Sequence, residues 1–277
     1  MGALDLQVPL SVVAVGALYA LGGIGLAGPA RHRRRDAWRA ASFYSGLVVL
    51  VVALDSPIDS LADRSFALHM TQHVLLLTVV PPLVVLAAPW ARLWRPFPLG
   101  LRRTVARNVV VAPRFVWLRA VAHGCAHPGV AWGLFSANLV AWHVPAAYDL
   151  TLRNGAVHKT EHLLFLATGL LFWAQVIPSP PFRVRLGEVA RAFYALAAMG
   201  VGWVLAIVLA FEPHPLYAPY AALVHRPGGL SALGDQQVAA GVMWVPGSLA
   251  FSLAAVLLLV RFIAPAGAPA LTPSLER

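Results

Sequence analysis

Two pairs of histidines have a spacing that places both rings on one side of a helix. His69 and His73 are four residues apart, as are His158 and His162, and each pair opens an apolar run. Residues four apart lie on the same helical face, one turn from each other. Imidazole is the commonest metal ligand near neutral pH, and two such pairs on neighbouring helices offer four nitrogens to one ion. The spacing therefore predicts a metal site, although a single buried histidine can also hydrogen-bond a backbone carbonyl.

Further polar residues fall at the ends of other apolar segments. His143 ends one segment and Asp235 opens the last one, while Glu161 adjoins His162. Each of these can be an additional ligand, or an acceptor that orients a ligand ring. Asp235 can equally cap the helix that it opens. Met70 and Met243 add thioethers, which favour cuprous copper.

The elements that must position these residues are membrane-spanning helices. The chain has 277 residues, of which 59% are hydrophobic and 12% charged, and its mean hydropathy is +0.72. Soluble domains carry about 25% charged residues. We therefore expect an all-α polytopic membrane protein, a bundle of seven transmembrane helices. The spans are predicted at residues 8–27, 38–54, 66–88, 129–146, 158–177, 190–211 and 236–263.

The basic residues predict how this bundle is oriented. With the N-terminus outside and the C-terminus cytoplasmic, the inner segments hold 17 of the 21 Lys and Arg residues. Such an excess is the usual mark of cytoplasmic loops. The net charge of +10 is thereby explained without nucleic acid as a partner. In this topology the paired histidines, His143 and Asp235 all lie near the outer ends of their spans.

The chain reads as one domain with a tail. Residues 1–264 form the predicted seven-helix membrane domain, with an interfacial cytoplasmic segment at about residues 101–127. Residues 265–277 are predicted to be a flexible cytoplasmic tail. Tyr148 is expected in an outer turn. The single cysteine, Cys125, excludes a disulfide framework and a paired-thiol metal site.

Three stretches of the chain resemble the membrane-bound assembly factors of caa3-type cytochrome c oxidase, often called CtaG. They are residues 68–90, 142–181 and 234–244, within a similarity that extends over about residues 40–260. The resemblance implies a multi-pass protein of the bacterial plasma membrane, with cytochrome c oxidase subunits as partners and copper as the ion supplied to the oxidase. Carried over by motif, the candidate ligands are His69, His73, His143, His158, His162 and Asp235. Ala239 and Ala240 stand in the third stretch where a glycine is expected, a departure that affects packing.

Two alternatives use the same residues differently. A zinc-dependent membrane hydrolase of the ceramidase-like kind needs an open metal position and a general base, for which Glu161 or Asp235 is available. A bis-histidine haem protein would use one ligand from each pair, which leaves the doubled histidines unexplained. Without a nucleophile motif, the sequence favours a metal-binding assembly factor over an enzyme.

Overall fold

The computed structural model describes residues 7–24 and 30–264, and the predicted tail at 265–277 lies outside this range. The described chain is helical and contains no β-strand, only an isolated bridge between Ser179 and Phe182. The all-α class is thus confirmed.

A helix occupies each of the seven predicted spans. They are α1 (Gln7–Gly23), α2 (Ala30–Leu54), the α4–η1–α5 helix (Phe66–Ala87), α9 (Pro128–Trp142), α11 (Gly155–Val176), α12 (Glu188–Phe211) and α14 (Ala232–Ile263). Four stretches are long and apolar enough to cross a membrane: Arg33–Ala62, Phe66–Ala87, Glu188–Phe211 and Ala232–Ile263. The count of seven spans and the orientation of the termini stay predictions.

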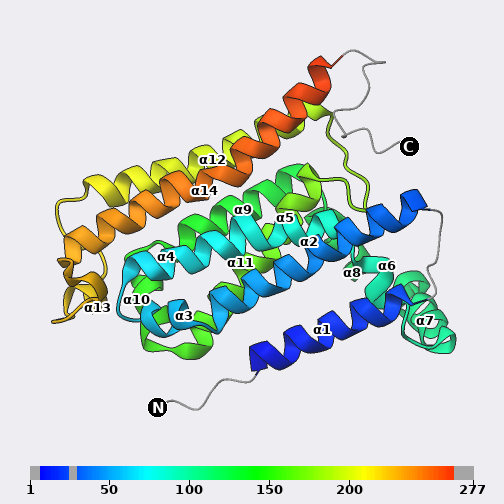
Figure 1. The fold of residues 1–277 in the computed structure, drawn as a ribbon, viewed down its shortest axis with the longest axis horizontal. Helices are drawn as coiled ribbons and strands as arrows, with labels where there is room; N and C mark the ends of the chain where they lie inside the picture. Colours follow the sequence, from blue (N-terminus) through cyan, green and yellow to red (C-terminus); the bar gives the residue numbers. More distant parts are fainter. Residues whose placement is uncertain (1–6, 25–29, 265–277) are drawn as a thin grey trace.

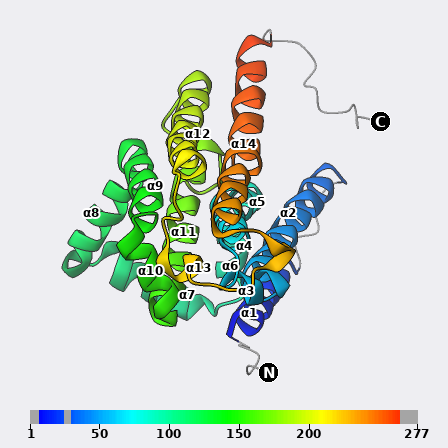
Figure 2. The same ribbon diagram turned by 90° about the vertical axis from the view of Figure 1, so that its left-hand side faces the viewer.

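The short helices gather at the two ends of the molecule. α3 (Pro57–Ala62), α10 (Pro145–Arg153) and α13 (Ala218–Ala221) lie at the left-hand end in Figure 1. α6 (Trp90–Trp94), α7 (Leu99–Val105) and α8 (Val116–Cys125) lie toward the other end. α12 and α14 run side by side, and the end-on view in Figure 2 places α11 among the central helices. Each long helix therefore ends near at least one of these two groups of short helices.

The predicted interfacial segment is helical but interrupted. α7 continues into a π-helical turn, η2 (Ala106–Val111), and Pro113 then opens a 3₁₀ turn, η3 (Pro113–Phe115), before α8. Proline has no N–H to continue the preceding helix, which explains the break. α7 and α8 each leave apolar side chains exposed, among them Leu101 on α7 and Trp117 on α8.

Pro81 affects how the helix that carries His69 and His73 packs against its neighbour α11. In that helix, α4 (Phe66–Val74) passes through the π-helical η1 (Leu75–Val79) into α5 (Val80–Ala87). Pro81 has no N–H for the carbonyl of Leu77, four residues before it. Trp173 of α11 fills this vacancy, because its Nε1–H donates to the Leu77 carbonyl at 2.9 Å.

The same contact depends on a glycine. A Cβ atom on Gly169 would lie 2.8 Å from Cγ of Pro81, closer than van der Waals contact allows. Only glycine lets α11 approach α5 this closely. The Pro81–Gly169 contact and the Trp173 hydrogen bond together fix α11 against the helix that bears the first histidine pair.

Candidate metal centre

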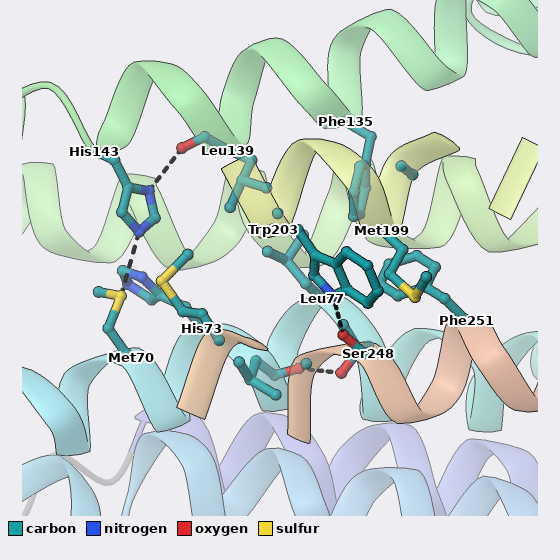
Figure 3. A pocket seen from close by; sticks show the side chains of 16 residues that line it. Met70, His73, Leu77, Phe135, Leu139, His143, Met199, Trp203, Ser248 and Phe251 are labelled. Carbon is teal, nitrogen blue, oxygen red and sulfur yellow. Dashed lines mark hydrogen bonds between the residues drawn. The ribbon is translucent and has the colours of Figure 1, made fainter. Parts of the chain in front are cut away.

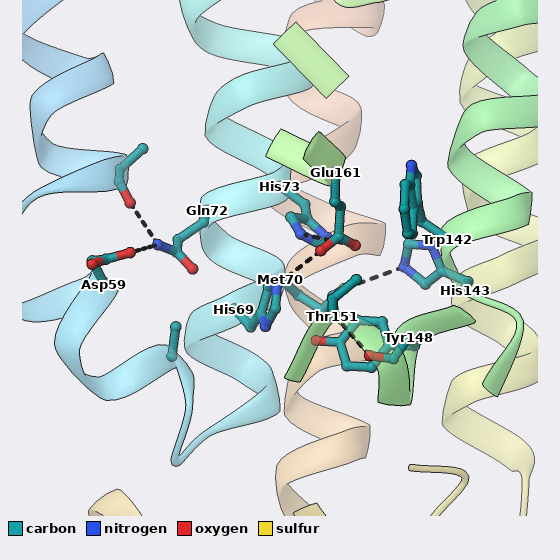
Figure 4. Close-up of polar contacts among 12 residues, drawn as sticks. Asp59, His69, Met70, Gln72, His73, Trp142, His143, Tyr148, Thr151 and Glu161 are labelled. Atoms are coloured by element: carbon teal, nitrogen blue, oxygen red, sulfur yellow. Dashed lines mark hydrogen bonds and ion pairs between the residues drawn. The ribbon is translucent and has the colours of Figure 1, made fainter. Parts of the chain in front are cut away.

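The two predicted histidine pairs face each other across the contact between α4 and α11. His69, His73, Glu161 and His162 each offer a donor atom, and these four atoms all lie within 4.8 Å of one another. Figure 4 shows His69 and His73 on one helix with Glu161 opposite them. We call these four residues the His/Glu cluster.

Glu161 lies between the rings of the first pair. One carboxylate oxygen is 3.7 Å from Nε2 of His69, and the other is 3.5 Å from Nε2 of His73. The side chains of Glu161 and His69 are completely buried, and that of His73 is nearly so. The carboxylate thus bridges two imidazoles where water does not reach.

The cluster's polar atoms lack hydrogen-bond partners in the described part of the chain. Both carboxylate oxygens of Glu161, both ring nitrogens of His73 and Nε2 of His69 and His162 are buried without one. Leaving such groups unpaired costs about 1–3 kcal/mol each. A cation at the centre would satisfy several of them at once, so the residues present fit a bound metal ion.

A tyrosine sets which nitrogen of His69 faces the cluster. The Tyr220 hydroxyl donates to the Ala62 carbonyl at 2.6 Å and lies 3.0 Å from Nδ1 of His69. Burial raises the pKa of Tyr220, so the phenol keeps its proton. Because the hydroxyl hydrogen is donated to the Ala62 carbonyl, the hydroxyl oxygen can only accept from His69, and Nδ1 of His69 therefore carries the ring hydrogen. The Nε2 lone pair of His69 is then directed to the cluster, the usual way in which a metal-binding histidine is oriented.

Asp235 lies at the start of α4, away from the cluster. Its carboxylate accepts from Ser65 Oγ at 2.8 Å and from the backbone N–H groups of Phe66 and Ala67 at 2.7 and 3.2 Å. Its own helix, α14, is capped by Ser231 instead. Asp235 therefore caps a neighbouring helix, and it holds the turn that precedes His69.

His158 and His143 lie on different sides of the cluster. The ring of His158 is half-buried, with its centroid 4.8 Å from that of His69 and 4.2 Å from that of His162. His143 is buried, and its ring centroid lies 6.2 Å from that of His73. His158 thus occupies the more exposed rim, while His143 lies deeper.

The sequence indicates Glu161 too weakly, leads to a wrong placement of Tyr148, and does not indicate Tyr220. Glu161 appeared there only as an accessory group, although its position beside His162, three residues after His158, places it on the same helical face. Tyr148, expected in an outer turn, is completely buried in α10 with its ring centroid 5.1 Å from that of His69. The contact of Tyr220 with His69 spans 151 positions in the sequence, and no local pattern signals it.

These features define an all-helical membrane protein with a buried cluster of imidazole and carboxylate donors between two of its helices. The sequence profile of the cytochrome c oxidase caa3 assembly factor (Caa3_CtaG) family matches residues 17–264. The chain belongs to this family, and the resemblance found in its motifs is confirmed.

Similar proteins occur in mycobacteria. Uncharacterized proteins of Mycobacterium bovis and Mycobacterium tuberculosis are each 26% identical to this chain over 243 residues, which is 84% of the chain and 34% of the relative. A relative from Mycobacterium leprae is 26% identical over 242 residues, 83% of the chain and 36% of the relative. The chain thus spans about a third of the length of these proteins. No solved structure matches it.

Proposed function

We propose that this cytochrome c oxidase assembly factor binds a copper ion at the His/Glu cluster and delivers it to subunits of the oxidase. The protein would act as a multi-pass component of the bacterial plasma membrane, with the cluster near the outer face. The single observation that carries the proposal is the group of buried donor atoms within 4.8 Å of one another, without hydrogen-bond partners among the described residues.

The electrostatics of the cluster favour a cation. With its proton on Nδ1, His69 directs a lone pair at a carboxylate oxygen only 3.7 Å away. Two acceptors facing each other in a dry environment repel unless a proton or a metal ion lies between them. Three imidazoles and one carboxylate form a donor set that suits copper and zinc.

The surroundings of the cluster support a route for a cation from the predicted outer side. His158 lies at the rim, and Asp59 and Asp63 are near enough to act on it electrostatically. Negative charge at an opening raises the local concentration of cations.

The number of converging donors favours an ion-binding assembly factor over the hydrolase and the haem protein. A hydrolase keeps one metal position open for water, whereas four protein donors converge on this point. A haem places its macrocycle around the iron and takes one axial ligand on each side. The four converging donors exceed the two axial positions that a haem iron offers to the protein.

The test combines metal analysis with oxidase assembly. Protein purified anaerobically after growth with copper should carry the ion, and His162→Ala should lose it together with the ability to restore oxidase activity to cells that lack the factor. The matched control is His214→Ala, because the side chain of His214 is 84% exposed. A His162→Ala variant that still restores full oxidase activity would refute the proposal, and zinc in place of copper would favour the hydrolase.

A further inference from the structure

Every methionine beyond the first residue lines the same cavity. The sequence contains four methionines, and Met70, Met199 and Met243 all border a cavity of about 50 Å³ between α4, α9, α12 and α14. His73 and His143 border it too. Figure 3 shows Met70, His73 and His143 grouped at one end, and Met199 beside Trp203 and Phe251 at the other.

The contact between Met70 and His143 lacks a proton to hold it together. Nδ1 of His143 lies 2.7 Å from the Leu139 carbonyl, which can only accept, so Nδ1 carries the ring hydrogen. Nε2 of the neutral ring then has a bare lone pair, yet it lies 3.3 Å from Sδ of Met70. A thioether has no hydrogen to donate. Two lone-pair donors therefore face each other in a buried position.

This pair has the spacing of two ligands on one metal ion. With metal–nitrogen and metal–sulfur distances of about 2.0 and 2.3 Å, a tetrahedral ion holds such ligands about 3.5 Å apart. The observed separation of 3.3 Å is close to that value. Met243 borders the same cavity and offers a second thioether.

The lining of the cavity selects for a soft ion of low charge. Thioethers favour cuprous copper over harder divalent ions. Among the described residues, the lining includes no aspartate or glutamate, so nothing there neutralises a second positive charge. The His/Glu cluster differs in both respects, because it has a carboxylate and no sulfur.

His73 connects the two sites. Its Nε2 is 3.5 Å from Glu161 in the cluster, and the same side chain borders the cavity. Neither of its ring nitrogens has a hydrogen-bond partner in the described structure. We propose that the Met70–His143 end of the cavity, with Met243, is a second metal site, specific for cuprous copper, which exchanges the ion with the cluster through His73. This proposal rests on copper binding at the cluster, and the ion moves without a change of oxidation state.

X-ray absorption of the purified full chain, loaded anaerobically with cuprous copper, tests the proposal. The wild type should show a sulfur shell at about 2.3 Å from copper. Met70→Leu should weaken this shell by about half, because Met243 remains, and the double variant Met70→Leu/Met243→Leu should lose it and retain nitrogen and oxygen neighbours. A Leu–Met exchange conserves volume, so the variants should fold. Met199→Leu is the matched control, because Sδ of Met199 contacts Ser252 at 3.5 Å and lies at the far end of the cavity, and it should keep the shell.

The possible outcomes separate this proposal from the proposed function. A wild type with only nitrogen and oxygen neighbours overturns the thioether site and leaves copper binding at the cluster intact. Equal loss of sulfur in Met70→Leu and Met199→Leu also overturns it, because the effect would then follow general repacking of the cavity. A wild type that binds no copper in either oxidation state overturns the proposed function itself.

Discussion

Replacing Glu161 by glutamine should change stability and metal binding in opposite directions. In the metal-free protein both carboxylate oxygens are buried and unpaired, opposite Nε2 of His69 and His73 at 3.7 and 3.5 Å. The amide of Glu161→Gln removes the charge and presents an N–H group to these lone pairs. Relieving one buried unpaired group is worth about 1–3 kcal/mol. The metal-free variant should therefore melt a few degrees above the wild type.

The metal-bound comparison should run the other way. At a metal concentration 100 times its Kd, the wild type gains about 2.7 kcal/mol of stability. Loss of a group that holds or orients a ligand lowers metal affinity about 10- to 100-fold. At the same metal concentration, a 100-fold weaker variant gains only about 0.4 kcal/mol. The copper-induced rise in melting temperature should therefore nearly disappear.

Thermal unfolding in detergent, with and without copper, measures both effects. Glu188→Gln is the control, because Glu188 lies on α12, its side chain is 34% exposed, and it pairs with Arg191 at 3.7 Å. This control should keep the full copper-induced shift. The reasoning fails if Glu161→Gln lowers the melting temperature of the metal-free protein or leaves the copper-induced shift intact.

Three further substitutions test how the site is positioned. Asp235→Asn should lower the free energy of unfolding by about 1–3 kcal/mol with or without metal, because a charged acceptor of three hydrogen bonds at the start of α4 is lost. An effect seen only with copper in the same unfolding assay would contradict the capping role. Tyr220→Phe should weaken copper binding about 10- to 100-fold in a competition titration, because His69 loses the partner that fixes its tautomer. The control Tyr194→Phe should bind copper normally, since the Tyr194 hydroxyl donates to the Pro128 carbonyl, away from the cluster. Gly169→Ala should lower the free energy of unfolding by about 1–3 kcal/mol, because the added methyl group would collide with Pro81. The control Gly200→Ala, whose methyl group would meet no atom within 4 Å, should be neutral or slightly stabilising. Equal effects of the two substitutions would exclude close packing as the cause.

The sequence by itself determines the helical class, a helix at each of the seven predicted spans, and the two histidine pairs. Hydrophobic length and a spacing of four residues are local properties, and a helix satisfies most of its backbone hydrogen bonds internally wherever it packs. The presence of Pro81 likewise predicts that the Leu77 carbonyl lacks its helical hydrogen-bond partner.

The tertiary structure decides which groups meet. It brings Trp173 to the carbonyl that Pro81 leaves free, and it directs Asp235 to the start of α4 instead of its own helix. It also places Glu161 between His69 and His73, and Met70 against His143. These pairings join residues up to 170 positions apart and depend on how closely the helices pack and how they are rotated. No local pattern encodes those two quantities, which is why the sequence predicts the donors and only the fold selects the set that converges.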